Sequence, residues 1–398
     1  MYAYSPLPNL RPGGRPILRR WSQFHTVAAG LLFACAFLPL LYLWSQPGQR
    51  KISPLSELSD HTCDAVQSTP GQRNETDIPN LVHYVWLLKD PDTFTLNFKH
   101  FVTIYSAYLF FDPDHIYIHT DASPTTFEQA KSSGDTWTRR VLAISKVTPN
   151  YVKTPTTAAN GVKIHRMEQK SDFLRIAALR QFGGIYLDMD AIPLRSVAHL
   201  RTSGFANVVG GAHALTMQDS NFLNNGVMMS KPGSLMMEVC SQAAEQIFDG
   251  SWNSVGPYLL TDLANRMAAI PGEVLILQPE AFAPVSYQLA DQKRLFEPRV
   301  EPEVAITGDA TREWDRNGGT ACTDVLAWLK ERKLEKWEID LSSTYVLHAF
   351  DDNLSGIRGW DHIIDVKYVL ARQSNYARAV YPAIRHAIEA GLIPEAAI

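Results

Sequence analysis

The sequence is poor in cysteine and has no excess of positive charge, and both shortages limit what the protein can do. It has 4 cysteines in 398 residues, and no Cys or His spacing suggests a zinc site. The formal net charge is −4 at pH 7, and no cluster of basic residues is present. Nucleic-acid binding is therefore not expected. No internal repeat is visible either.

One long stretch lacks charge. From Phe24 to Trp44 there is no Asp, Glu, Lys or Arg, and four arginines precede the run. Such a run can cross a bilayer, and the positive-inside rule keeps the N-terminus in the cytosol. We expect a single-pass type II protein with a cytoplasmic tail at 1–23, a transmembrane signal-anchor at 24–45 and a lumenal stem at 46–77.

A cleaved signal peptide is the alternative, but the bulky residues after the run form no small-X-small site. The short span fits the thinner membranes of the early secretory pathway, so we expect Golgi membranes. Asn74 and Asn353 begin glycosylation sequons, which a lumenal location would expose to glycosylation. Of Cys63, Cys240 and Cys322, all beyond the span, at most two can form an internal disulfide, and the pairing stays open.

The centre of the sequence predicts a helix, a tight turn and a strand. Ser171 to Phe182 is rich in helix formers with periodic apolar positions, and Ser171 can cap the first turn. Gly183-Gly184 ends the helix, because glycine accepts the positive φ that a helix C-terminus often needs. Ile185 to Met189 then predicts a buried strand.

Two spacings in this unit bring polar groups together. Side chains two apart share a face of a strand, so Asp188 and Asp190 should point the same way at its end. Asp172 and Arg175, three apart, share a helix face beside that pair. These four residues suit a divalent metal and a phosphate ester, and they are our candidate catalytic residues.

Asp-X-Asp alone is a weak signal. The pairs Asp90/Asp92 and Asp112/Asp114 have the same spacing, but an intervening proline predicts solvated turns. For the central pair, the alternative is an exposed strand end without a ligand. The context favours a site, because Ser-Asp-X-X-Arg, a Gly-Gly turn and an apolar strand precede the two acids.

This context resembles the signature of the family 32 glycosyltransferases, whose sugar-binding region contains a DXD motif. The resemblance spans roughly residues 78 to 362. It implies an α/β, GT-A-like nucleotide-diphospho-sugar transferase fold with a mainly parallel sheet. We expect a catalytic domain at 78–365 and a C-terminal helical extension at 366–398.

Other segments fit that fold. Residues 78–87 and 115–119 predict buried strands on either side of a helix at 96–111, and residues 377–390 predict a further helix. In a parallel sheet, ligands bind at the carboxyl ends of strands, where Asp188 and Asp190 fall.

The resemblance also implies roles for residues. Asp190 would bind Mn²⁺ or Mg²⁺ directly, and Asp188 would lie nearer the ribose or the metal's water shell. Asp172 would hold sugar hydroxyls, and Arg175 a phosphate or sugar oxygen.

Three more donor-binding candidates follow from the resemblance. Trp86 would stack on the base, Asn225 would face sugar hydroxyls, and His348 would contact the diphosphate or the metal. Trp86 and Asn225 have plainer alternatives, a core tryptophan and a turn asparagine. The roles of the residues that follow His348 stay open, namely Asp351, Asp352 and Trp360.

The resemblance implies transfer of a hexose from GDP-mannose or a UDP-hexose to a glycan or glycolipid, with retention of configuration. One alternative is an inactive sugar-binding or scaffold protein with the same fold. Another is a phosphatase of the haloacid-dehalogenase type, with Asp188 as nucleophile and Asp190 as general acid. The Ala191-Ile192 that follows is not the small hydroxyl pair usual in those phosphatases.

Overall fold

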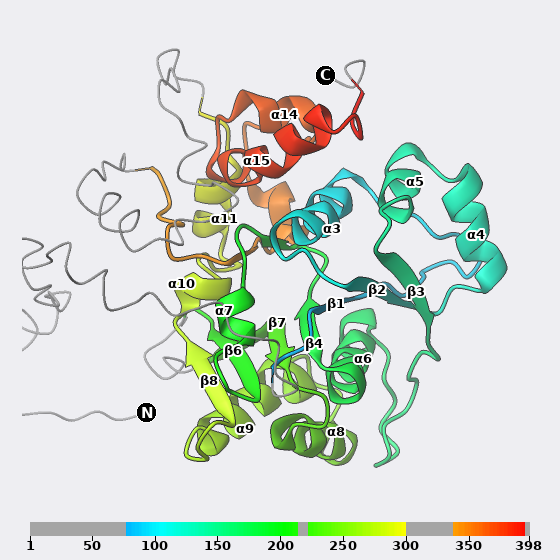
Figure 1. Cartoon of the computed structure of the whole chain (residues 1–398), viewed down its shortest axis with the longest axis vertical. Coiled ribbons are helices and arrows are strands. Elements are labelled where there is room, and N and C mark those ends of the chain that lie inside the picture. The colour runs from blue at the N-terminus through cyan, green and yellow to red at the C-terminus, as the bar shows by residue number, and fades with distance from the viewer. Residues whose placement is uncertain (1–76, 214–221, 300–336, 395–398) are drawn as a thin grey trace, which may run out of the picture. The chain divides into compact units, whose positions relative to one another are not determined.

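A computed structural model describes residues 77–213, 222–299 and 337–394 of the chain (Figure 1). All of these residues lie in one compact unit, Cys63–Ile398. The predicted tail, the membrane span and the stem up to residue 76, with Asn74 and Cys63, lie outside the described residues, as does Cys322. Among the helices of the described ranges, none combines the length and the apolar character that a bilayer span requires.

The core of the unit is a seven-stranded sheet in the order β3-β2-β1-β4-β7-β6-β8. The pairs β3-β2, β2-β1, β1-β4 and β6-β8 are parallel, whereas β7 is antiparallel to both β4 and β6. This confirms the predicted α/β class with a mainly parallel sheet. The strands are β1 (Leu81–Val85), β2 (His115–Thr120), β3 (Val147–Tyr151), β4 (Gly184–Leu187), β6 (Asn207–Gly211), β7 (Leu223–Ser230) and β8 (Val274–Leu277).

Helices cover both faces of this sheet (Figure 1). Ile185 and Leu187 of β4 are buried in the core that includes α3, whereas Tyr186 faces the core formed with α6, α8 and α9. A sheet covered on both faces explains why its strands are apolar without strict alternation. The helices on these two faces include α3 (Phe98–Phe110), α14 (Val366–Ala371) and α15 (Asn375–Glu389), and, opposite them, α6 (Met167–Phe182), α8 (Leu235–Ile247) and α9 (Leu259–Met267).

Shorter elements complete the described chain. They are the helices α4 (Pro124–Ser133), α5 (Thr136–Leu142), α7 (Ala198–Arg201), α10 (Pro279–Phe282) and α11 (Leu289–Phe296), the π-helical turn η3 (Ser254–Tyr258), the 3-10 turn η4 (Asp351–Gly356), and the strands β5 (Ala191–Pro193) and β9 (Val346–His348). Strands β5 and β9 form a separate two-stranded sheet.

Helix α6 begins earlier than predicted. It starts at Met167, so Ser171 lies inside the helix and the predicted N-cap role was wrong. The extra turn is held by Gln169, whose Oε1 accepts the backbone N–H of Arg166 at 3.4 Å. Its Nε2 donates to the backbone carbonyl of Gly250 at 3.0 Å. A tertiary contact thus extends the helix beyond its local signals.

Strand β4 ends sooner than predicted. It stops at Leu187, and Asp188 to Asp190 form a turn in which the N–H of Ala191 donates to the carbonyl of Asp188 at 2.9 Å. The strand alternation expected for the two acids was therefore wrong. They are instead brought to one side by the turn that leads from β4 into β5.

The Gly183-Gly184 turn has the backbone that the sequence predicted, with φ of +64° and +98°. His83 of β1 holds it in place, since its Nε2 donates to the carbonyl of Gly183 at 2.8 Å. Burial lowers the pKa of His83 to about 4, against the opposing effect of that carbonyl, so the ring is neutral. Its Nδ1 then accepts from Nε2 of His119 on β2 at 3.0 Å. The first two strands are thereby fastened to the turn that precedes the acidic pair.

The C-terminal helices belong to the same core as the sheet, because α15 packs against α3 and α11. Trp360 stacks between Phe296 and Tyr368, which gives it a packing role. Cys240 is a buried free thiol, and burial raises its pKa to about 12. The 365/366 domain boundary stays a prediction.

Gly184 offers a test of this packing. A Cβ there would lie 2.5 Å from the carbonyl oxygen of Leu81, at a φ of +98°. We expect Gly184→Ala to lower the free energy of unfolding by about 2–6 kcal/mol, from backbone strain and overpacking together. The matched control is Gly204→Ala, where φ is +88° but no atom lies within 4 Å. That change should cost about 1–2 kcal/mol in urea unfolding of the full-length protein. Equal losses for the two variants would contradict the close approach of β1 to the turn.

Candidate active site

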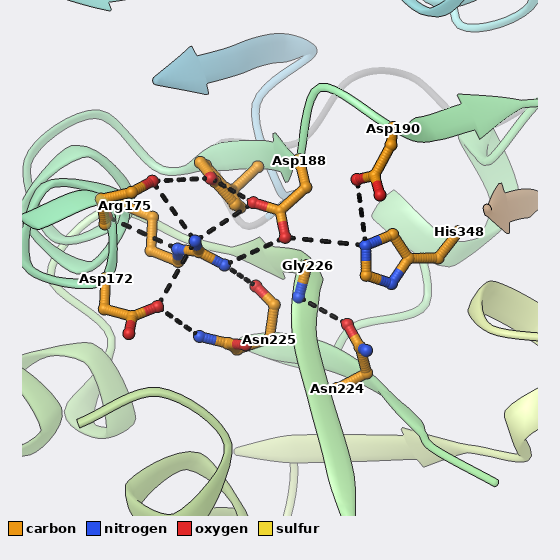
Figure 2. A network of polar contacts seen from close by, with 10 residues as sticks. Asp172, Arg175, Asp188, Asp190, Asn224, Asn225, Gly226 and His348 are labelled. Atoms are coloured by element: carbon orange, nitrogen blue, oxygen red, sulfur yellow. Dashed lines mark hydrogen bonds and ion pairs between the residues drawn. The ribbon is translucent and has the colours of Figure 1, made fainter. Parts of the chain in front are cut away.

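The turn between β4 and β5, together with the neighbouring strand β9, brings three of the predicted residues together. Asp188 follows β4, and Asp190 lies in the turn before β5. Strand β9 pairs with β5 so that His348 lies opposite Ala191, and the N–H of Ala349 donates to the carbonyl of Asp190 at 2.9 Å. As a result, Nε2 of His348 lies 3.2 Å from Oδ1 of Asp190 and 3.7 Å from Oδ2 of Asp188 (Figure 2).

These three side chains form a set that could hold a metal ion. One ligand atom from each of Asp188, Asp190 and His348 lies within 4.8 Å of the others. Gly226 keeps the space clear, since a Cβ there would come within 2.7 Å of both Oδ2 of Asp188 and Cε1 of His348. Two carboxylates and one imidazole suit Mn²⁺, and the carboxylates alone suit Mg²⁺.

The histidine and the carboxylates stabilise each other's charge. Burial acts to lower the pKa of His348, but the charges of Asp190 and Asp188 outweigh it and the pKa is raised. Burial acts to raise the pKa of Asp190, yet His348 outweighs that effect and the pKa is lowered. A proton is therefore held between Asp190 and His348, and a metal that binds there must displace it.

Arg175 joins the acidic pair to Asp172. Its Nη2 lies 3.1 Å from Oδ1 of Asp188 and 3.3 Å from Oδ1 of Asp172. Its Nη1 donates to the backbone carbonyl of Asn225 at 2.8 Å (Figure 2). Its guanidinium lies over the ring of Tyr186, 4.5 Å from the centroid. Arg175 is 5% exposed. Its guanidinium thus faces protein acceptors on several sides, and its predicted contact with a phosphate or sugar oxygen stays untested.

Asp172 is held from a second side. Nδ2 of Asn225 donates to its Oδ1 at 2.8 Å. Gly256 lies close by, since a Cβ there would be 3.0 Å from Oδ2 of Asp172. Burial raises the pKa of Asp172 to about 6, although Arg175 acts against this. The predicted amide of Asn225 therefore faces Asp172, and contact with a sugar hydroxyl stays a prediction for both residues.

Sequence reasoning missed several residues of the site. The hydroxyl of Tyr186 donates to Oδ1 of Asp188 at 2.6 Å, and Ser171 lies 3.3 Å from both that hydroxyl and Nη2 of Arg175. Oδ1 of Asn224 accepts the N–H of Gly226 at 2.6 Å. The sequence does not mark Tyr186 as a site residue, because it lies among the apolar residues of a strand.

The remaining predicted residues lie around this centre. Trp86 follows β1 directly and is half-buried, with its ring edge-on to that of His100 at 4.5 Å. Asp351 pairs with Lys99 at 2.8 Å, which settles its position. Asn353, in the second sequon, lies on η4.

A family model described as "Glycosyltransferase sugar-binding region containing DXD motif" matches residues 91–207, which include Asp172, Arg175, Asp188 and Asp190. Human lactosylceramide 4-alpha-galactosyltransferase is 30% identical over 158 residues, which cover 37% of this chain and 41% of the human enzyme. The chain is a glycosyltransferase family 32-like protein.

Two further comparisons with this family 32-like chain show weaker similarity. Glucan organizing enzyme 1 of Cryptococcus neoformans is 26% identical over 212 residues, 52% of this chain and 54% of that protein. The crystal structure of the glycosyltransferase GlyE of Streptococcus pneumoniae is 9% identical, with a TM-score of 0.37 over 79% of this chain and 64% of GlyE. The chain spans less than half the length of the human enzyme that it matches.

The raised pKa of Asp172 predicts a pH effect on stability. Its pKa is about 6 in the folded protein and about 3.9 when unfolded. The stability that a raised pKa contributes is fully present below about pH 4 and lost as the pH rises through about 6. Between pH 4 and 7, the free energy of unfolding of the wild type should therefore fall by on the order of 3 kcal/mol relative to that of Asp172→Asn. Urea unfolding across this range with chelator present measures the difference, and parallel curves would contradict the burial of a charged Asp172.

Proposed function

We propose that this chain transfers a hexose from a nucleotide-diphosphate sugar to a glycan or glycolipid acceptor. The observation that carries the proposal is the convergence of Asp188, Asp190 and His348 beside the buried Arg175. The match to the DXD sugar-binding region supports it, because that match contains both acids. The GT-A-like assignment of the mainly parallel sheet belongs to the same proposal.

The residues present fit a divalent cation. Nε2 of His348 faces both carboxylates, and the missing side chain of Gly226 leaves room between them. Asp190 and His348 would hold the ion, with Asp188 as a further ligand or partner of its water shell. A bound Mn²⁺ or Mg²⁺ would supply positive charge that stabilises the departing diphosphate.

The other residues of the site keep these ligands in place. Tyr186 and Arg175 hold both oxygens of Asp188, which leaves its orientation independent of the ligand. Asp172 and Asn225, joined to each other, would face hydroxyls of the transferred sugar. Such fixed polar groups accelerate a reaction because they need no reorientation as charge develops.

Trp86 would stack on the nucleobase. It stands at the carboxyl end of β1, and β1 is the neighbour of the strand that leads to Asp188. Ligands of parallel sheets bind at this edge. The base itself, uracil or guanine, stays open, so GDP-mannose and UDP-hexoses are both candidate donors.

The human relative's name states an α-galactosyl transfer to lactosylceramide. On that likeness, a glycolipid acceptor and a galactose donor are the first to test for this chain. Retention of configuration would follow from a displacement on one face of the sugar, in which the leaving phosphate accepts the acceptor's proton. A type II enzyme of Golgi membranes, glycosylated at Asn74 and Asn353, completes the proposal.

The alternatives receive less support. In a haloacid-dehalogenase phosphatase the acidic motif follows the first strand, whereas here it follows β4. An inactive scaffold could have the same fold. It would not require Tyr186 and Arg175 to fix the orientation of the Asp188 carboxylate.

Asp190→Asn tests the metal site. The amide keeps the shape but removes a charge that a divalent cation needs, so Mn²⁺-dependent hydrolysis of the donor should fall by at least about a hundredfold. The change also lowers the repulsion among the carboxylates, but Asp190 pairs with His348 at 3.2 Å. We therefore expect the variant to lose about 1.5–3 kcal/mol of unfolding free energy in chelator.

The control for this change is Asp92→Asn, in an exposed turn with the same Asp-X-Asp spacing. It should leave both hydrolysis and stability as in wild type. If Asp190→Asn kept near-full turnover in Mn²⁺, the proposed metal-dependent transferase activity would be contradicted. The hypothesis of an inactive scaffold would then be favoured.

A further inference from the structure

His100 lies on the first turn of α3, in a part of the chain that the acidic motif does not include. Its backbone N–H donates to Oδ1 of Asn97 at 3.2 Å, and its own Nδ1 accepts the backbone N–H of Asn97 at 3.1 Å. This reciprocal pair is a capping box, with the imidazole as the acceptor. Since Nδ1 is an acceptor, the proton of the neutral ring is on Nε2.

Contacts of His100, of its neighbour Lys99 and of α3 as a whole relate this turn to the proposed metal site. On one side, the ring centroid of His100 lies 4.5 Å from that of Trp86, which follows β1. On the other, its neighbour Lys99 pairs at 2.8 Å with Asp351, just beyond His348. The negative charge of Asp190 acts to raise the pKa of His100, against the larger effect of burial. Helix α3 also packs against β5, the strand that directly follows Asp190. The first turn of α3 is thus tied to the end of β1 and to the segment after His348.

The Nε2–H group of His100 has no hydrogen-bond partner among the residues that the structure describes. The capping hydrogen bond and the contact with Trp86 hold the ring of His100, so the direction of this donor is set before any ligand binds. Burial, with a smaller effect from Lys99, lowers the pKa of His100 to about 4. A neutral donor at this position adds a hydrogen bond without repelling a cation at Asp190.

We propose that Nε2 of His100 donates a hydrogen bond to a diphosphate oxygen of the nucleotide-sugar donor. The inference rests on the proposed function, which places that diphosphate at Asp190. A hydrogen bond to a charged phosphate oxygen is stronger than one between neutral groups, so a single oriented N–H contributes measurably to affinity. Lys99 cannot take this role while it pairs with Asp351.

Two substitutions separate ligand binding from packing. His100→Gln keeps an acceptor for the capping box and an N–H donor, whereas His100→Met keeps the bulk against Trp86 and loses both. We measure the binding of UDP and GDP, and of UMP and GMP, to the full-length protein in Mn²⁺ by calorimetry. His100→Met should weaken diphosphate binding roughly ten- to a hundredfold and monophosphate binding less, whereas His100→Gln should stay within a few-fold of wild type.

The control is His115→Met, at an exposed histidine that begins β2, which should bind as wild type does. The proposal is overturned if His100→Met binds the diphosphates as wild type does, with or without a lower melting temperature. Equal losses for Gln and Met would also overturn it, because they would show that the donor group is irrelevant. If wild type itself binds neither diphosphate in Mn²⁺, the proposed function fails and this inference fails with it.

Discussion

Three carboxylates lie close together in a largely buried place, and the protein must neutralise them before any ligand arrives. Arg175 serves two of them, because its Nη2 lies 3.1 Å from Asp188 and 3.3 Å from Asp172. His348 serves the third, Asp190, at 3.2 Å. Removing Arg175 or His348 would leave negative charge in the site without its partner, which costs more than the pair itself contributes. The site therefore has two halves. In one half, Arg175 pairs with Asp172 and Asp188. In the other, His348 pairs with Asp190 through a proton that a metal can replace.

That division of charge depends on the order of the strands. The Gly183-Gly184 turn sends α6 directly into β4, so Asp172 and Arg175 lie beside the end of the strand that leads to Asp188. The short pairing of β5 with β9 then brings His348 to the other side of the acids. Gly226 on β7 passes between them without a side chain. Each element contributes one or two groups, and their spacing is set by backbone hydrogen bonds rather than by flexible loops.

Much of this arrangement could be predicted from local signals. The glycine pair, the helix before it and the apolar strand after it identify the central unit, and the spacing of Asp172, Arg175, Asp188 and Asp190 identifies the acidic centre. The boundaries were less accurate where distant residues decide them. Gln169 extends α6 through contacts with residues near 250, and the pairing of β5 with β9 turns the chain before Asp190.

Other features have no local signal at all. Tyr186 stands in a strand where any large buried residue would fit, yet its hydroxyl orients Asp188. His348 was assigned only through a family resemblance, because nothing near it in the sequence shows that β9 pairs with β5. His100 reads as an ordinary helix residue, and its capping role depends on Asn97 having the right backbone. Such contacts depend on tertiary structure and could not be read from spacing.

The central claim is that the acids and His348 bind a metal that activates a nucleotide-sugar donor. Its most direct test is donor hydrolysis by the full-length protein, with UDP-galactose, UDP-glucose, UDP-N-acetylglucosamine and GDP-mannose each assayed in Mn²⁺ and in EDTA. We predict that at least one donor is hydrolysed in Mn²⁺, that EDTA abolishes this, and that added Mn²⁺ restores it. Hydrolysis that EDTA leaves unchanged, or no hydrolysis of any donor by folded protein, would contradict the account.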